Sequence, residues 1–370
     1  MINLLEEPWY RLLCKRRDLN LQYTLGGGQS FRWKKINENE WWGIFCSRFW
    51  MLKQTDNFIL YKVAKQVTPS KKCSVLLSEL HEDLSLKKFL AHLSTDSVTL
   101  SEEEKKLQIC DAADELNGML LCKYLRLDTN LEECYNRWGQ RDPIFQKAAS
   151  KCYGVRLLCQ EPLETILTFI CSSNNHIKRI TSMIEKLCSL YGEEIGVIDG
   201  VKYFDFPDVE QLVAPSVHGT LAKAGFGYRA GFIHKSACMI QELGGYEWIN
   251  KLKLLPYEAA RKELVRLPGV GFKVADCICL MSLGHLNAVP VDTHIHQVAK
   301  QHYMKSLRNA KTLSNTLYLD IMKFFQDIHG PDAGWAQTVL FCADLKNIGN
   351  EQTPEENGTG ETKTKKKRTK

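Results

Sequence analysis

The stretch LPGVGFKVADC, residues 267–277, decides how the second half of this chain folds. In the preceding YEAARKELVRL, residues 257–267, apolar side chains recur at helical spacing, so we predict a helix there. The Pro-Gly-Val-Gly turn ends that helix, and a second helix with its own apolar stripe begins at about Phe272. The two helices and their tight turn predict a helix-hairpin-helix.

Lys273 stands in the first turn of the second helix, directly after the glycines. A glycine turn that opens a helix exposes backbone N–H groups at the positive end of the helix dipole, which suits a phosphate. The same dipole, together with desolvation, disfavours an ammonium there, so Lys273 is a candidate neutral amine able to attack carbon. A lysine that only contacts phosphate, or a glycine turn that only joins two helices, fits the motif equally well.

Asp292 lies where the next helix should begin, in AVPVDTHIHQVAK, residues 288–300. Its carboxylate is expected to cap that helix. A capping carboxylate whose second oxygen faces the lysine could also orient a substrate sugar and stabilise positive charge developing on it. The combination of a lysine opening one helix and Pro-Val-Asp opening the next is fairly specific.

The chain divides into two regions with different patterns. Residues 19–63 are rich in aromatic and β-branched residues, and LGGGQS and KKINENE interrupt them as turns, which predicts an antiparallel sheet. Residues 66–118 are more polar, with helical stretches at about 75–93 and 102–116, and from about residue 120 onward we predict an all-α bundle. The expected class is α+β, with domains at 1–158 and 159–348 and a disordered basic tail at 349–370.

Composition narrows the functional classes. The 370 residues are 44% hydrophobic and carry a net charge of +6, which permits a polyanionic partner without proving one. No apolar run is long enough for a membrane helix, so no membrane partner is expected. The 14 cysteines include no C-x-x-C pair, which argues against a zinc site or a disulfide framework and favours a reducing compartment.

Together, LPGVGFKVADCICLM and AVPVDTH resemble the helix-hairpin-helix DNA glycosylases, in particular the eukaryotic 8-oxoguanine DNA glycosylases. The resemblance extends through GGGQSFRW, FICSSNNHIKRIT, GFGYRAGFI and GPDAGWAQTVLFCADL and covers most of residues 20–348. It implies a β-sheet domain packed on a helical hairpin domain, and an enzyme with glycosylase and lyase activities. Lys273 would attack the sugar and form a Schiff base, and Asp292 would assist the displacement of the oxidised base.

The resemblance also implies a pocket for the extruded base. The backbone carbonyl of Gly28 would accept the ring N–H that distinguishes 8-oxoguanine from guanine, and glycine permits the close approach. The Gln337 amide would bind the pairing edge, Phe341 and Cys277 would stack on the base, and Asp344 would be a further pocket residue. From the residues alone, Gly28 is a hairpin turn, Phe341 and Cys277 are core residues, and Gln337 and Asp344 are solvated.

A second set of residues would contact the DNA outside this pocket. Asn174 would enter the space that the base leaves, Arg179 and Arg229 would bind the opposite cytosine, and Tyr228 would bend the duplex. His294 and the hairpin glycines, Gly269 and Gly271, would contact phosphate. Their ordinary alternatives are a helix cap for Asn174, solvated charges for the arginines and an exposed or satisfied histidine.

The sequence departs from the family pattern at two places, and several other classes of protein are alternatives. Residues 66–118 do not follow the family pattern, and Phe272 is bulkier than the residue expected beside the lysine. Endonuclease III-like relatives carry a four-cysteine iron–sulfur cluster after the aspartate, but here only Cys342 follows Asp292. Relatives specific for alkylated bases lack the lysine, while a helix-hairpin-helix protein that binds DNA without catalysis would not need the pocket residues.

The expected cofactors and partners follow from the same resemblance. We expect no cofactor and no metal among the site residues, and leave open a structural cation at the hairpin. Damaged double-stranded DNA is the expected partner, with downstream base-excision-repair proteins as further candidates, and the chain is expected to be a monomer. The basic KTKKKRTK, residues 363–370, indicates a nuclear import signal or an arm that binds DNA without sequence preference, and its ordinary alternative is a solvated charged end. A nuclear location is expected, with a mitochondrial pool left open.

Overall fold

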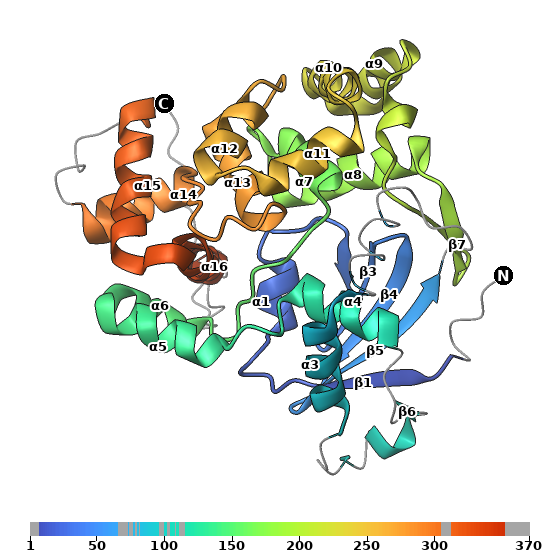
Figure 1. Cartoon of the computed structure of the whole chain (residues 1–370), viewed down its shortest axis with the longest axis vertical. Helices are drawn as coiled ribbons and strands as arrows, with labels where there is room; N and C mark the ends of the chain where they lie inside the picture. Colours follow the sequence, from blue (N-terminus) through green and yellow to red (C-terminus); the bar gives the residue numbers. More distant parts are fainter. Residues whose placement is uncertain are drawn as a thin grey trace, which may run out of the picture.

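A computed structural model describes residues 7–65, 73, 77, 80, 82–95, 100–101, 104–107, 109–110, 115–304 and 312–351. It has a β-sheet region below a larger helical region, with the hairpin helices α12 and α13 in the helical part (Figure 1). The α+β class is therefore confirmed. None of the helices in the described ranges is long and apolar enough to cross a membrane.

The main sheet lies in the N-terminal part of the chain. Its described strands are β1 (Trp9–Leu13), β2 (Trp33–Lys35), β3 (Glu40–Phe45), β4 (Arg48–Gln54), β5 (Phe58–Lys65) and β6 (Ile109–Cys110). They follow the order β2-β3-β4-β5-β1-β6, and every pair is antiparallel except the short β1·β6 pair. The predicted antiparallel sheet is thus confirmed, with one parallel edge.

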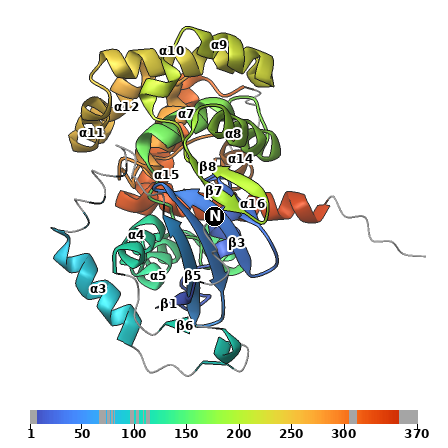
Figure 2. The ribbon, with the colours of Figure 1, turned by 90° about the vertical axis from the view of Figure 1, so that its right-hand side faces the viewer.

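Both faces of this sheet are covered, which explains the nearly continuous apolar run of β4. Trp50 and Leu52 face one side, where they pack with helices α3 (Leu84–Thr95) and α4 (Glu115–Leu125). Phe49 and Met51 face the other side, where the hairpin of β7 (Glu194–Ile198) and β8 (Val201–Phe204) covers them (Figure 2). Alternate side chains of a strand point to opposite faces, so a strand buried on both sides must be apolar throughout.

The remaining elements are mostly helices. They are α1 (Leu21–Gly26), α5 (Leu131–Arg141), α6 (Pro143–Lys151), α7 (Pro162–Ser172), α8 (Ile177–Tyr191), α9 (Ser216–Leu221), α10 (Arg229–Glu242), α11 (Tyr246–Leu254), α12 (Tyr257–Val265), α13 (Phe272–Met281), α14 (Thr293–Val298), α15 (Asn315–His329) and α16 (Ala333–Glu351). Short 3-10 segments lie at Glu104–Lys106, Val209–Leu212 and Gly330–Asp332, and π-helical turns at Ala222–Phe226 and Ala299–Tyr303.

Helix boundaries follow the predicted break signals. Asp142 and Glu161 each precede a proline and accept hydrogen bonds from the first free backbone N–H groups of α6 and α7. The α12–α13 connection also forms as predicted, since the Val270 N–H donates to the Leu267 carbonyl at 3.0 Å and α13 begins at Phe272. The helix-hairpin-helix is therefore confirmed.

Three local predictions were wrong. The segment before the glycines forms helix α1, because Asn20 caps it, whereas the predicted sheet missed strand β1. Within 102–116, residues Ile109–Cys110 pair with β1 as strand β6, so the tertiary contact overrides the local helical pattern. The β7–β8 hairpin interrupts the half predicted to be all-α, because the exposed face of the main sheet requires an apolar cover.

The structure leaves other expectations untested. Much of 66–118 and the tail from residue 352 onward lie outside the described residues. The domain limits at 158 and 348 stay predictions, and α16 runs to Glu351.

Candidate active site

One cavity lies where the hairpin helix α13 meets the glycine loop after α1 and helix α16. It is lined by Gly27, Gly28, Gln29, Phe169, Lys273, Cys277, Met281, Pro290, Asp292, Gln337, Thr338 and Phe341. Six residues predicted from sequence therefore share this cavity, although they come from segments more than 300 positions apart: Gly28, Lys273, Cys277, Asp292, Gln337 and Phe341.

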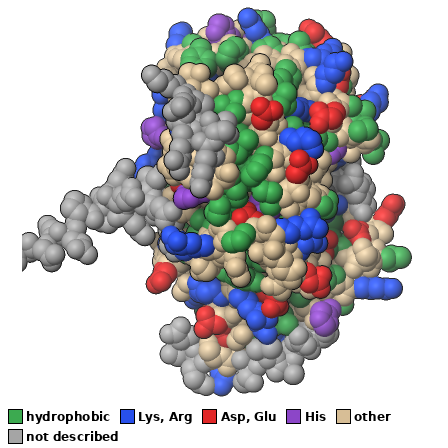
Figure 3. Space-filling view, turned by 90° about the vertical axis from the view of Figure 1, so that its left-hand side faces the viewer, with side chains coloured by type: hydrophobic (Ala, Val, Ile, Leu, Met, Phe, Trp, Pro, Cys, Tyr) green, Lys and Arg blue, Asp and Glu red, His purple; other side chains and the backbone are tan. Residues whose placement is uncertain are grey.

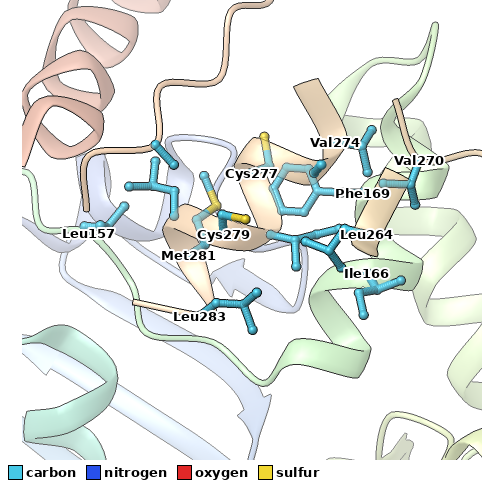
Figure 4. Close-up of a cluster of buried hydrophobic side chains, with 14 of the residues drawn as sticks. Leu157, Ile166, Phe169, Leu264, Val270, Val274, Cys277, Cys279, Met281 and Leu283 are labelled. Atoms are coloured by element: carbon cyan, nitrogen blue, oxygen red, sulfur yellow. The ribbon is translucent and has the colours of Figure 1, made fainter. Parts of the chain in front are cut away.

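Lys273 extends from the first turn of α13 into the cavity. Its Nζ lies 5.1 Å from the centre of the Phe169 ring, which comes from α7. Cys277, one turn further along α13, hydrogen-bonds the Lys273 amine; burial raises the pKa of its thiol to about 11, and Lys273 opposes that shift. Figure 4 shows Phe169 beside Cys277 on α13. A thiol with such a pKa is protonated at neutral pH, so it offers apolar contact surface and no negative charge.

Asp292 combines the two roles that its position in the sequence predicted. Its Oδ1 accepts a hydrogen bond from the Ile295 N–H at 2.9 Å, so it is the N-cap of α14. The same side chain lines the cavity that contains Lys273. An amine and a carboxylate that face one cavity can act together on a substrate carbon and on the positive charge that develops there.

The glycine loop is held rigidly at the cavity wall. Gly28 has a φ of +77°, which favours glycine because other residues are strained in this region. The next residue, Gln29, is fully buried, and its side chain donates to the Arg156 carbonyl at 2.8 Å and accepts from the Leu158 N–H at 2.9 Å. Gln160 in turn donates to the Gln29 carbonyl at 2.8 Å. The backbone of Gly28 is therefore positioned before any ligand enters.

Gln337 and Phe341 project into the cavity from α16. Gln337 is 95% buried, yet its amide has no hydrogen-bond partner within the described part of the chain. An amide that faces a cavity can bind a ligand that offers complementary donors and acceptors.

The structure places Asp344 differently from the other pocket candidates. It does not line the cavity, and its Oδ2 lies 3.0 Å from His294 Nδ1. The His294 ring in turn packs edge-on against Phe341, with ring centres 5.5 Å apart. The expected role of Asp344 as a pocket residue stays a prediction; in this structure Asp344 contacts His294, which in turn contacts the lining residue Phe341.

The residues predicted to contact the opposite strand gather around the loop between α7 and α8. The Tyr228 hydroxyl donates to the Ser173 carbonyl at 3.0 Å, and the Arg229 guanidinium donates to the carbonyls of Ser173 and Asn174. Arg229 is buried under the half-exposed Tyr228 ring, 4.5 Å from its centre. Asn174 has a φ of +47°, so the loop tip is a sharp turn that presents its side chain outward.

Arg179 and Arg229 have different environments. Arg179 is exposed on α8 and makes one long contact, 3.5 Å, to the Gly225 carbonyl. Because Arg229 already binds two protein carbonyls, it supports the loop, whereas the guanidinium of Arg179 remains available to a ligand.

Several lining residues were missed by sequence reasoning. Phe169 and Met281 read as ordinary helix core, and Gln29 as part of a turn. Ile177 is 41% exposed at the start of α8 and lies near Gly28, so it joins the cavity to the α7–α8 loop. In the sequence, the isoleucine that follows the polar SSNNH was a signal for this position, and it is weak alone.

The hairpin glycines differ in what they do. Gly269 has a φ of +86°, and a Cβ there would lie 2.8 Å from Phe232 Cδ2, so packing against α10 demands glycine. Beside Gly271, no atom of the described residues other than its chain neighbours lies within 4 Å of an added Cβ. A phosphate group of a nucleic-acid backbone can therefore approach the main chain at Gly271.

Acidic and basic side chains are interspersed on the face shown in Figure 3, as expected from the modest net charge. Across the described ranges, no group of three or more His, Cys, Asp or Glu residues is placed to hold a metal ion. A structural cation at the hairpin stays a prediction.

Comparisons with known proteins agree with this geometry. Residues 11–166 match the family described as 8-oxoguanine DNA glycosylase, N-terminal domain, and residues 167–318 match the HhH-GPD superfamily of base excision DNA repair proteins. The N-glycosylase/DNA lyase OGG1 of Arabidopsis thaliana is 34% identical over 91% of this chain and 80% of its own length. The N-glycosylase/DNA lyase of Saccharomyces cerevisiae is 33% identical over 93% of this chain and 88% of its own.

A solved structure shows the same fold. MBOgg1 in complex with a low-affinity DNA ligand superposes with a TM-score of 0.66 at 26% identity and covers 90% of this chain and 93% of its own. The cavity, the hairpin and these relatives lead to one conclusion: the chain belongs to the 8-oxoguanine DNA glycosylase family of N-glycosylase/DNA lyases.

Proposed function

We propose that this protein excises 8-oxoguanine from duplex DNA, preferentially opposite cytosine, and then cleaves the strand through a covalent lysine intermediate. One observation carries the proposal: Lys273 and Asp292 share a cavity with the rigid Gly28 backbone and the unpartnered Gln337 amide. A base inside a duplex must leave the stack to be excised, and a cavity of this composition suits an extruded purine.

The proposed reaction starts with the amine of Lys273. Its lone pair forms a bond to the anomeric carbon, the glycosidic bond breaks, and the base leaves with the bonding electrons and takes up a proton. Ring opening and loss of a proton from nitrogen produce the Schiff base, and removal of a C2′ proton expels the 3′ phosphate. Asp292 stabilises the positive charge that develops on the sugar.

Recognition of the lesion is assigned to the cavity wall. The carbonyl of Gly28 accepts the N7–H of 8-oxoguanine, which guanine lacks, and the Gln337 amide binds the pairing edge. Phe341 closes one face of the base, with the neutral thiol of Cys277 on the other. Because Gly28 and Gln29 are fixed, the Gly28 carbonyl cannot move away when guanine, which has no N7–H, enters the cavity. Guanine would therefore bind less well than 8-oxoguanine.

Recognition of cytosine is assigned to the α7–α8 loop. Arg179 supplies donors to the acceptors of cytosine, while Arg229 holds the Asn174 turn in place and Tyr228 wedges into the duplex. Gly271 and His294 contact the phosphates. Further proposals are a monomeric protein and a nuclear location directed by residues 363–370, which lie outside the described residues.

The test is borohydride trapping on a duplex with one 8-oxoguanine opposite cytosine. The wild type should form a covalent protein–DNA adduct, and Lys273→Gln should form none. Lys262→Gln, an exposed lysine on α12, is the matched control and should trap like the wild type. A wild type that binds this duplex without trapping would favour a DNA-binding protein without catalysis, and trapping by Lys273→Gln would refute the role of that lysine.

A further inference from the structure

A buried polar cluster lies behind the cavity, on the side of α13 that faces away from substrate. At its centre is Asp276, which is fully buried one turn after Lys273. Its carboxylate accepts hydrogen bonds from the hydroxyls of Tyr257, at 2.7 Å, and Tyr318, at 2.5 Å. Arg261 Nε lies 2.9 Å from Oδ1, as an ion pair without hydrogen-bond alignment. The cluster joins α12, α13 and α15.

Tyr318 connects this cluster to the loop that carries Asp292. Its hydroxyl donates to Asp276 and accepts from the Val291 N–H at 3.2 Å. Val291 immediately precedes Asp292 in the sequence. The position of the Asp292 backbone relative to α13, and hence to Lys273, is therefore set by two hydrogen bonds in series.

Phe272 belongs to the same cluster, which accounts for the bulky residue beside the lysine. Its ring covers the Arg261 guanidinium at 4.4 Å and packs against the Tyr318 ring, with centres 5.9 Å apart. Phe272 does not line the cavity. The departure noted in the sequence thus supports the orientation of Tyr318 and leaves the approach to Lys273 open.

We propose that Tyr318, held by Asp276 and packed on Phe272, is a positioning residue that sets the placement of Asp292 relative to Lys273. Tyr318 is 95% buried and outside the cavity, so it acts through Asp292 and not on substrate. This inference rests on the proposed function. Displacements of about 1 Å at a reacting centre can cost on the order of 100-fold in rate, so one lost hydrogen bond is expected to be measurable.

The experiment compares Tyr318→Phe with a matched hydroxyl deletion. Tyr303→Phe removes a similar bond, from a tyrosine to the buried carboxylate of Asp142 at 2.7 Å. Tyr303 lies in the same helical half, but among the described residues its hydroxyl makes no hydrogen bond to the Asp292 loop. Base excision and adduct trapping are measured in single turnover with excess enzyme, together with DNA affinity and melting temperature.

Tyr318→Phe should slow base excision about tenfold with DNA affinity unchanged within a factor of about two, while Tyr303→Phe should lower only the melting temperature. In the Tyr318→Phe/Asp292→Asn double variant, the tyrosine change should add nothing to the loss caused by Asp292→Asn alone, because both act through one carboxylate.

The measurements distinguish failure of the positioning role from failure of the proposed function. A Tyr318→Phe rate within twofold of the wild type, an equal loss in Tyr303→Phe, or multiplicative losses in the double variant would overturn the positioning role while leaving the proposed function intact. Absence of trapping by the wild type would instead remove the proposed function, and this inference with it.

Discussion

The amine of Lys273 lies over the ring of Phe169, 5.1 Å from its centre. The ring comes from α7 and is nearly fully buried, so its position is fixed, whereas the lysine side chain that lies on it is flexible. The lysine side chain therefore packs against the face of this ring. The contact restricts where the amine can lie before substrate binds.

Phe169→Leu should therefore slow adduct formation several-fold while leaving DNA affinity nearly unchanged. Leucine keeps the site apolar but removes the ring face, and the smaller side chain should lower the free energy of unfolding by about 1 kcal/mol. Single-turnover trapping and thermal unfolding measure the two effects. Phe145→Leu, at a fully buried ring outside the cavity, controls for stability and should trap at the wild-type rate.

Two substitutions of Asp292 distinguish its role as the helix cap of α14 from its role in base excision. Asp292→Asn retains an oxygen that can cap α14, so its melting temperature should stay close to the wild type while base excision falls at least 100-fold. Asp292→Ala loses both, with an additional cost of about 1 kcal/mol in stability. Equal rates for Asp292→Asn and the wild type would show that this carboxylate is only a cap.

Gly28→Ala tests the rigid backbone of the base pocket. An added Cβ would make ordinary contacts, 3.6 Å to Ile177 and 3.8 Å to Phe341, so the expected cost is backbone strain of about 1–2 kcal/mol at φ +77°. A shift of the carbonyl to relieve that strain should reduce excision of 8-oxoguanine more than tenfold. The control is Gly200→Ala in the β7–β8 turn, at φ +76° with open space, which should lose stability alone.

The two arginines should respond differently to truncation. Arg179→Ala should remove most of the preference for cytosine over adenine opposite the lesion, with unchanged stability, because Arg179 is exposed. Arg229→Ala should also destabilise the protein by about 1–3 kcal/mol, since it leaves the Ser173 and Asn174 carbonyls without their donor. Excision rates opposite each base and unfolding curves give the comparison, with the exposed Lys186→Ala on α8 as a control.

The environment of Asp276 predicts that the free energy of unfolding depends on pH. Burial raises the pKa of its carboxyl to about 6 from the usual 3.8, although Arg261, Tyr318 and Tyr257 oppose the shift. Above pH 4 the unfolded chain has lost this proton while the folded protein keeps it, so this group's contribution to stability falls as pH rises from about 4 to about 6 and is then constant.

The corresponding measurement is unfolding by denaturant across pH 4–7 for the wild type and Asp276→Asn. The stability of the wild type relative to the variant should fall by about 3 kcal/mol over this interval. A difference that stays constant, or grows with pH, would show that the carboxylate is ionised throughout the range.

The sequence by itself determined the hairpin, its lysine and the caps. Local spacing and turn chemistry suffice for these, since a Pro-Gly turn ends a helix wherever it lies and an aspartate after Pro-Val caps the next one. The motifs also carried the family resemblance, and with it Gly28, Gln337 and Phe341, although their periodicity alone indicated a turn, a solvated amide and a core residue.

Only the tertiary structure decided how these residues meet. The cavity requires α1, α13 and α16 to converge, and nothing local in the sequence places Phe169 under Lys273 or Asp344 at His294. The β7–β8 cover of the sheet and the Tyr318 link to Val291 arise in the same way, because burial of distant apolar faces and satisfaction of buried polar groups depend on the whole packed chain.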